Sequence, residues 1–136
     1  MATPLALTGV HHIALTVTDV PRAREFYSKM LGFNLLMELG PKTIMGNGGT
    51  ILALNLAYDA TQSPPNDRFT ENRAGLDHVS FGVASRADLE AAVQTFDQNN
   101  IPHGEINDLG HAGLPIYVLA FRDPDNIQLE LTAPHS

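Results

Sequence analysis

The sequence predicts an α+β fold in which one strand–helix–strands unit occurs twice. A short alternating segment, His12-Ile13-Ala14-Leu15-Thr16-Val17, has a counterpart in His78-Val79-Ser80-Phe81-Gly82-Val83. Each segment is followed by apolar residues at helical spacing and then by further strand candidates. Because neither half could bury its sheet face alone, we expect the two halves to form a cup-shaped mixed sheet with the helices on its outer face.

The first half begins with a strand over residues 10–17, whose even-numbered side chains share one face. Asp19 is a typical N-cap for the helix that follows, and Gly32 is a typical residue to end it. Turn residues then separate three short strand candidates. These candidates lie at about 33–38, about 42–46 and 50–57.

The second half repeats this order after a polar segment, residues 59–75, which we expect to be a linker or a mobile loop. Ser85 and Asp88 resemble a capping box at the start of a helix over about 86–99. Strands are expected at 77–84, about 103–107, 115–121 and 126–132. We therefore predict a single domain over residues 1–136, with module one at about 8–57, the linker at about 58–75 and module two at about 76–133.

The composition excludes several classes of function. The chain of 136 residues has no cysteine, which excludes disulfides, thiolate catalysis and sulfur ligands for a metal. A net charge of −7 and eight scattered Lys and Arg residues argue against nucleic acid as a partner. No apolar run is long enough for a membrane span, and the first residues lack the pattern of a signal peptide. We therefore expect a cytoplasmic protein with no membrane partner.

Three side chains carry the most specific chemistry: His12, His78 and Glu130. The alternation of each strand directs them toward the expected inner face. Two imidazoles and one carboxylate are the donors of a facial metal triad with open positions. A single histidine on a strand more often has a structural role, but a carboxylate among Ile and Leu residues is costly to bury unless it is paired or binds a cation. The pattern as a whole favours a metal site.

Three segments together resemble the vicinal oxygen chelate superfamily of glyoxalases, bleomycin resistance proteins and extradiol dioxygenases. They are residues 12–19, 75–83 and 121–131, and the resemblance covers about Val10 to Thr132. It implies paired βαβββ modules and a homodimer. By position, it also implies that His12, His78 and Glu130 bind a divalent metal ion, which could be Fe, Mn, Ni, Co or Zn.

The same resemblance separates this chain from the better-known members. Glyoxalase I takes a further carboxylate from the last strand of the first module, where the best-aligned residue is Ala53. Isomerisation uses that carboxylate as a general base close to the substrate. Because alanine cannot act as a base, Ala53 argues against true glyoxalase I activity. The extradiol dioxygenases have a catalytic Tyr where this chain has Ala120, and the fosfomycin thiol transferases have a Thr where it has Ala14. The reaction therefore stays unassigned, and no catalytic residue is named.

Four side chains are candidates for substrate contacts: Asn55, Gln128, Tyr117 and His111. Asn55 and Gln128 share the inward face of their strands and are the strongest candidates. Tyr117 also suits an ordinary core position in a strand, and His111 also suits a solvated hairpin tip. For His103 we expect a surface position at the start of a strand.

The sequence leaves two functions open. The first is a metalloenzyme of the isomerase, lyase or dioxygenase type, which chelates two oxygens of a small oxygen-rich substrate at a divalent metal. The alternative is a protein of the same fold that binds a small molecule or confers drug resistance without catalysis.

Overall fold

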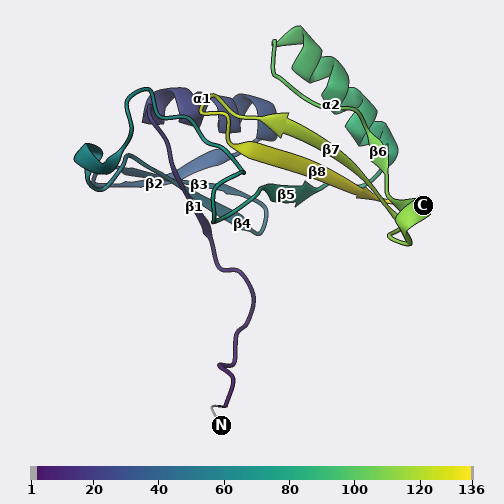
Figure 1. Ribbon diagram of the computed structural model, residues 1–136, viewed down its shortest axis with the longest axis horizontal. Helices are drawn as coiled ribbons and strands as arrows, with labels where there is room; N and C mark the ends of the chain where they lie inside the picture. The colour runs from purple at the N-terminus through teal and green to yellow at the C-terminus, as the bar shows by residue number, and fades with distance from the viewer. Residues whose placement is uncertain (1–2, 136) are drawn as a thin grey trace. The chain divides into compact units, whose positions relative to one another are not determined.

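The computed structural model describes residues 3–135 and confirms a mixed α+β fold of two βαβββ modules (Figure 1). The chain divides into two compact units, Met1–Pro64 and Pro65–Ser136, with one module in each. Residues 1, 2 and 136, which the domain prediction includes, lie outside the described residues. The joining of both modules into one cup-shaped domain stays a prediction.

Both units contain the predicted order of elements. The first holds β1 (Ile13–Thr16), α1 (Val20–Leu31), β2 (Asn34–Leu39), β3 (Lys42–Asn47), β4 (Thr50–Asn55) and the short 3-10 helix η1 (Ala60–Gln62). The second holds β5 (Val79–Gly82), α2 (Arg86–Gln98), β6 (Asn107–Asp108), the 3-10 helix η2 (Gly110–Ala112), β7 (Ile116–Arg122) and β8 (Gln128–Pro134).

The two sheets have the same topology. Sheet A pairs its strands in the order β1-β4-β3-β2, and sheet B in the order β5-β8-β7-β6. In each sheet the first and last strands of the module are parallel neighbours, and the other pairings are antiparallel. Ala14 lies opposite Ala53 in sheet A, as Ser80 lies opposite Glu130 in sheet B. The register thus confirms the internal repeat and puts Ala53 at the position that Glu130 occupies in sheet B.

The helix ends follow from local hydrogen bonds that the sequence predicts. Asp19 Oδ1 accepts from Arg22 N at 3.0 Å at the start of α1, and Gly32 ends this helix with a φ of 71°. At the start of α2, Ser85 N donates to Asp88 Oδ2 at 3.1 Å, which confirms the capping box. In residues 3–135 neither helix is long and apolar enough to cross a membrane.

Helix α2 covers one face of sheet B, on β7 and β8 (Figure 1). Phe96 of the helix stacks on Phe121 of β7 with ring centroids 4.5 Å apart, and Leu129 beside it in β8 is 1 % exposed. Since successive side chains on a strand alternate, Gln128 and Glu130 lie on the face away from α2. This confirms the predicted facing of the last strand. In sheet A the equivalent buried face packs on α1.

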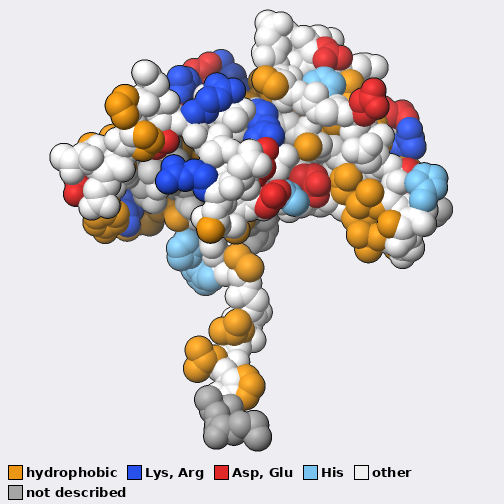
Figure 2. Space-filling model, in the orientation of Figure 1, with side chains coloured by type: hydrophobic (Ala, Val, Ile, Leu, Met, Phe, Trp, Pro, Cys, Tyr) orange, Lys and Arg blue, Asp and Glu red, His pale blue; other side chains and the backbone are white. Residues whose placement is uncertain are grey.

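The segment before β1 exposes its apolar side chains. Leu5, Leu7 and Val10 are 85 %, 83 % and 84 % exposed, and Figure 2 shows such side chains along this segment, which extends away from sheet A in Figure 1. The expected strand over 10–17 is therefore shorter, because only residues 13–16 pair with β4.

The expected strand at about 103–107 is wrong. His103 forms an isolated bridge with Phe121, and the strand β6 contains only two residues, paired with Tyr117 and Val118. The antiparallel register changes by one residue between these two points, so an extra residue interrupts the ladder as in a bulge. Gly104 in this stretch also contributes no side chain to a strand.

Residues 59–75, expected to be a linker or a mobile loop, make specific contacts with the second unit in their second half. Phe69 N donates to Asp125 O at 3.0 Å, and Asn126 Nδ2 donates to Phe69 O at 3.0 Å. Glu71 forms an ion pair with Arg122, with an Nη1–Oε1 distance of 2.6 Å. This part of the segment is therefore attached to the turn between β7 and β8.

Candidate metal centre

Two of the three predicted ligands lie together in the second unit. His78 directly precedes β5, and Glu130 lies on the neighbouring parallel strand β8. His78 Nε2 is 3.6 Å from Glu130 Oε1, and the side chains are 36 % and 19 % exposed. Two atoms that each lie about 2.1 Å from one divalent ion are about 3–3.5 Å apart. The pair therefore fits two adjacent ligand positions of one metal ion after a small approach.

The second ring nitrogen of His78 is held by a carboxylate. His78 Nδ1 lies 2.7 Å from Asp77 Oδ1, and because an ionised carboxylate only accepts hydrogen bonds, Nδ1 carries the hydrogen. In the neutral ring, Nε2 then keeps its lone pair and faces Glu130. Metal-binding histidines commonly use such an outer partner to fix the ring.

Glu130 is oriented by hydroxyl groups of its own sheet. Thr132 Oγ1 donates to Glu130 Oε1 at 3.3 Å, and Ser80 Oγ is hydrogen-bonded to Thr132 Oγ1. No Lys or Arg forms an ion pair with Glu130 in the described part of the chain. A half-buried carboxylate without a Lys or Arg partner suits a cation ligand.

His12 belongs to the first unit. It directly precedes β1 as His78 precedes β5, and it is exposed, with its Nδ1 2.9 Å from His11 Nδ1. Among residues 3–135, no group of three His, Asp or Glu side chains is positioned to hold a metal ion. The structure therefore brings His78 and Glu130 together. His12 belongs to the other unit, and the triad stays a prediction.

Gln128 supports Asp77. Gln128 Nε2 donates to Asp77 Oδ1 at 2.8 Å and to Asp77 O at 3.2 Å. Gln128 Oε1 accepts from Arg122 Nη2 at 3.4 Å. Both ends of this amide, which we expected at a substrate, are engaged by neighbours.

Asn55 differs from Gln128 because its side-chain oxygen has no partner. Asn55 ends β4 opposite Thr16, and its Oδ1 is buried without a hydrogen bond. Such orphaned acceptors are rare in folded proteins and call for an explanation. A ligand that donates a hydrogen bond would provide one.

The other two expected substrate contacts are Tyr117 in β7 and His111 in η2. Tyr117 faces the α2 side of sheet B, where Arg86 Cζ lies 4.9 Å from its ring centroid and the ring of His135 lies 4.4 Å away. His111 is exposed in η2. The structure thus places Tyr117 on the opposite face of the sheet from Glu130.

The sequence does not predict the bidentate pair between Glu71 and Arg122. Arg122 donates to both carboxylate oxygens, at 2.6 Å and 3.0 Å, and this hydrogen bonding lowers the pKa of Glu71 to about 2. The alternation of β7 already puts Arg122 beside Gln128 on the Glu130 face. Its acidic partner, however, comes from a segment without periodicity.

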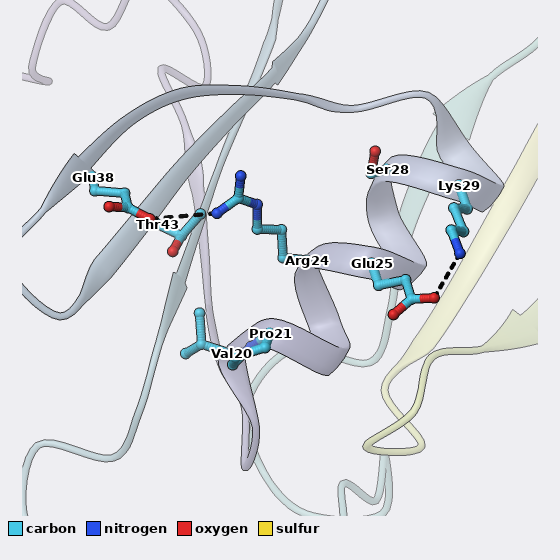
Figure 3. A pocket seen from close by; sticks show the side chains of 8 residues that line it. All are labelled: Val20, Pro21, Arg24, Glu25, Ser28, Lys29, Glu38 and Thr43. Atoms are coloured by element: carbon cyan, nitrogen blue, oxygen red, sulfur yellow. Dashed lines mark hydrogen bonds and ion pairs between the residues drawn. The ribbon is translucent and has the colours of Figure 1, made fainter.

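An open pocket of about 410 Å³ in the first unit lies apart from these groups (Figure 3). Its lining comes from α1, β2 and β3 and includes Thr43, which pairs with Leu54 on the helix side of sheet A. Its charges are already paired, Arg24 with Glu38 at 3.3 Å and Lys29 with Glu25 at 2.7 Å. This pocket offers no unpaired donor set for a metal.

Comparisons with known proteins find a family model and relatives that cover nearly the whole chain. Residues 9–131 match the model of the Glyoxalase/Bleomycin resistance protein/Dioxygenase superfamily. The uncharacterized protein YaeR of Escherichia coli is 32 % identical over 93 % of this chain and 97 % of its own length. The metallothiol transferase FosB of Staphylococcus haemolyticus is 28 % identical over 92 % of this chain and 83 % of its own.

A solved structure extends the likeness to three dimensions. The glyoxalase/dioxygenase from Nostoc punctiforme matches with a TM-score of 0.76 and 25 % identity, over 98 % of each chain. The matching βαβββ modules, the near-complete coverage and the family model lead to one conclusion. The chain belongs to the glyoxalase/bleomycin resistance protein/dioxygenase superfamily, the vicinal oxygen chelate proteins.

Proposed function

We propose that this protein is a metal-dependent enzyme that acts on a small molecule with two neighbouring oxygen atoms. The observation that carries the proposal is the pair of His78 Nε2 and Glu130 Oε1, 3.6 Å apart, with the other nitrogen of His78 held by Asp77. A purely structural ion pair of Glu130 would be expected to use Lys or Arg, and it would not need the outer carboxylate of Asp77 on its partner. The family of the chain supports the same interpretation.

His12, His78 and Glu130 would hold the metal ion. A divalent cation held by two imidazoles and a carboxylate supplies Lewis acidity and open positions for a bidentate oxygen ligand. The side chains of the protein then orient the substrate: Asn55 Oδ1 is an unpaired acceptor suited to a substrate hydroxyl or amide. We accordingly expect a substrate with at least one hydrogen-bond donor beside its two oxygens.

The residues at equivalent positions limit the reaction. Ala53 stands where sheet B has Glu130, so this position supplies no carboxylate for proton transfer. The name of FosB describes a metal-dependent thiol transferase, and this supports metal dependence as a shared feature. Ala14 occupies the position where that type of enzyme is expected to have a threonine, and we therefore do not propose thiol transfer.

Metal analysis tests the proposal directly. The wild-type protein, purified without chelator, would be compared with His12→Ala, His78→Ala and Glu130→Ala. His111→Ala is the matched control, because it removes an exposed histidine from η2. We expect bound divalent metal in the wild type and the control and a loss of at least about 10-fold in affinity in the other three.

The outcomes separate the two functions. Equal metal content in all five proteins would refute the triad. A wild type that binds no metal at micromolar concentration would favour the alternative, a binding or resistance protein without catalysis. If the metal is present, a methylglyoxal–glutathione assay should show little activity, and strong activity would mean that a base other than a residue at position 53 acts.

A homodimer and a cytoplasmic location are further parts of this proposal. Both rest on the sequence and the family resemblance, and light scattering of the purified protein would test the first.

A further inference from the structure

We propose that Asp77 is a positioning residue that fixes the ring of His78, and that Gln128 and Arg122 extend this support to Glu71. The inference rests on the proposed metal site, and it assigns a role to four side chains outside the triad. Their hydrogen bonds all lie within the second unit.

The direction of the His78 ring is set by its contact with Asp77. An imidazole without a partner can rotate and can carry its single hydrogen on either nitrogen. The 2.7 Å contact from His78 Nδ1 to Asp77 Oδ1 fixes both properties, because the carboxylate accepts and Nδ1 must donate. The lone pair of the neutral ring is then at Nε2, the atom that faces Glu130.

Asp77 is itself exposed, and its side chain is held by Gln128. Gln128 Nε2 contacts both the side-chain oxygen and the main-chain oxygen of Asp77, at 2.8 Å and 3.2 Å. These two contacts limit rotation of the Asp77 side chain relative to its own backbone. Gln128 of β8 therefore positions the Asp77 side chain, and its amide nitrogen is already engaged in these contacts.

Arg122 connects Gln128 to the polar segment before β5. Arg122 Nη2 donates to Gln128 Oε1 at 3.4 Å, while the same guanidinium donates to both oxygens of Glu71. Arg122 Nη1 also donates to Asn126 O at 3.2 Å. With these three partners, the guanidinium is held in one orientation, which in turn orients the Gln128 amide.

The equivalent position in the first unit provides a natural control. His11 precedes His12 as Asp77 precedes His78, and it too contacts the Nδ1 atom of its neighbour, at 2.9 Å. His11 is a neutral or cationic ring rather than an acceptor carboxylate, and Ile51 replaces Gln128 at the equivalent register position. We therefore expect that replacing Asp77 strongly reduces metal affinity and that replacing His11 reduces it only weakly.

The test combines two measurements on Asp77→Ala, Asp77→Asn, Gln128→Leu and His11→Ala. The first is the tautomer of His78 in the metal-free protein, obtained from long-range nitrogen–proton NMR correlations well above the ordinary pH range of imidazole titration. We expect hydrogen at Nδ1 in the wild type and in Asp77→Asn, which keeps an acceptor oxygen. In Asp77→Ala the hydrogen should shift toward Nε2.

The second measurement is the affinity for Co²⁺ or Zn²⁺ in competition with a chromogenic chelator. Loss of an outer partner typically weakens metal binding by about 10–100-fold, so we expect this range for Asp77→Ala. Gln128→Leu should lose less, and Asp77→Asn should restore most of the affinity. His11→Ala should bind nearly as the wild type does.

The two measurements separate failure of this inference from failure of the proposed function. If the wild type binds no metal, the proposed function fails, while the tautomer of His78 still decides the role of Asp77. If Asp77→Ala keeps the wild-type tautomer and affinity, Asp77 does not position His78 and the inference is overturned. Unfolding curves of all four variants show whether any loss reflects a damaged fold.

Discussion

The two modules share a backbone plan and differ in the side chains on one face of their sheets. On the helix side, Leu52 of sheet A and Leu129 of sheet B occupy equivalent register positions, and both are 1 % exposed. On the other face, sheet B has Glu130 where sheet A has Ala53. Apolar residues on the helix side thus repeat with the fold, whereas polar residues on the other face do not.

The same contrast continues along the last strand of each module. Thr132 is hydrogen-bonded to Ser80 and Glu130, while Asn55 at the equivalent position has an unpaired, buried Oδ1. In sheet B, Ser80, Glu130 and Thr132 are therefore hydrogen-bonded to one another. In sheet A, the side-chain oxygen of Asn55 has no hydrogen-bond partner. Of these polar groups, Asn55 Oδ1 is the one without a partner, and it is therefore the group that we propose for a ligand contact.

The largest expected effects test the shared part of the comparison. Leu52→Ala and Leu129→Ala each delete a buried side chain that packs between sheet and helix, and each should lower the free energy of unfolding by about 2–5 kcal/mol. Chemical denaturation followed by circular dichroism measures this loss. Leu39→Ala on β2, where the side chain is 57 % exposed, is the control and should cost no more than about 0.5 kcal/mol.

The two core variants should also resemble each other. Equivalent packing predicts that both substitutions lower the free energy of unfolding by similar amounts. A decrease of less than about 1 kcal/mol in only one of the two variants would contradict the equivalence of the modules. Hydrogen exchange of α1 and α2 would then show which helix packs less tightly.

The second prediction tests the differing face in the metal-free protein. Thr132→Val removes hydrogen bonds to Ser80 and Glu130 and should destabilise by about 1 kcal/mol. Asn55→Leu removes a buried acceptor without a partner and should leave stability unchanged or raise it by about 1 kcal/mol. Denaturation midpoints measure both, and a clear loss of stability in Asn55→Leu would show that its oxygen has a partner in solution.

Much of the fold follows from local sequence patterns. Helix ends could be predicted because Asp19, Gly32 and the Ser85–Asp88 pair act within a few residues of themselves. The facing of Leu129 and Glu130 could be predicted because strand alternation is a local property. The stretch from His103 to Asn107 was predicted as one strand because a register change depends on the partner strand β7 and has no local signal.

The candidate site divides in the same way. Alternation and the repeat suffice to select His78 and Glu130 for one face, and the structure brings them within 3.6 Å of each other. The support around them was missed because it joins residues distant in sequence: Glu71 and Arg122 meet only when a polar segment returns to the β7–β8 turn. For Gln128, strand parity predicts a substrate contact but does not show its amide partners, Arg122 of β7 and Asp77.

The smallest expected effect concerns the two helix C-termini. In the first module, Asn47 Nδ2 donates to Leu31 O at 2.7 Å, a contact that does not titrate near neutral pH. In the second, the ring of His103 is half-buried, with Nε2 2.7 Å from Asp97 Oδ1 and Nδ1 2.6 Å from Gly104 O. The expected surface position of His103 is therefore wrong. The hydrogen bond with Asp97, then that with the Gly104 carbonyl, raise the pKa of His103 above its usual 6.5.

The sign of the resulting pH dependence follows from that shift. Since the folded protein favours the protonated ring, the stabilisation is complete below pH 6.5 and is lost as the pH rises through the raised pKa. His103→Phe keeps a ring beside Phe96 and removes both donors. We expect the wild type to exceed this variant in stability by at most about 1 kcal/mol at acid pH, with a smaller difference at alkaline pH. Asn47→Ala should instead lower stability by the same amount at acid and at alkaline pH. If the stability difference between the wild type and His103→Phe does not change with pH, the ring of His103 is not protonated when it contacts Asp97.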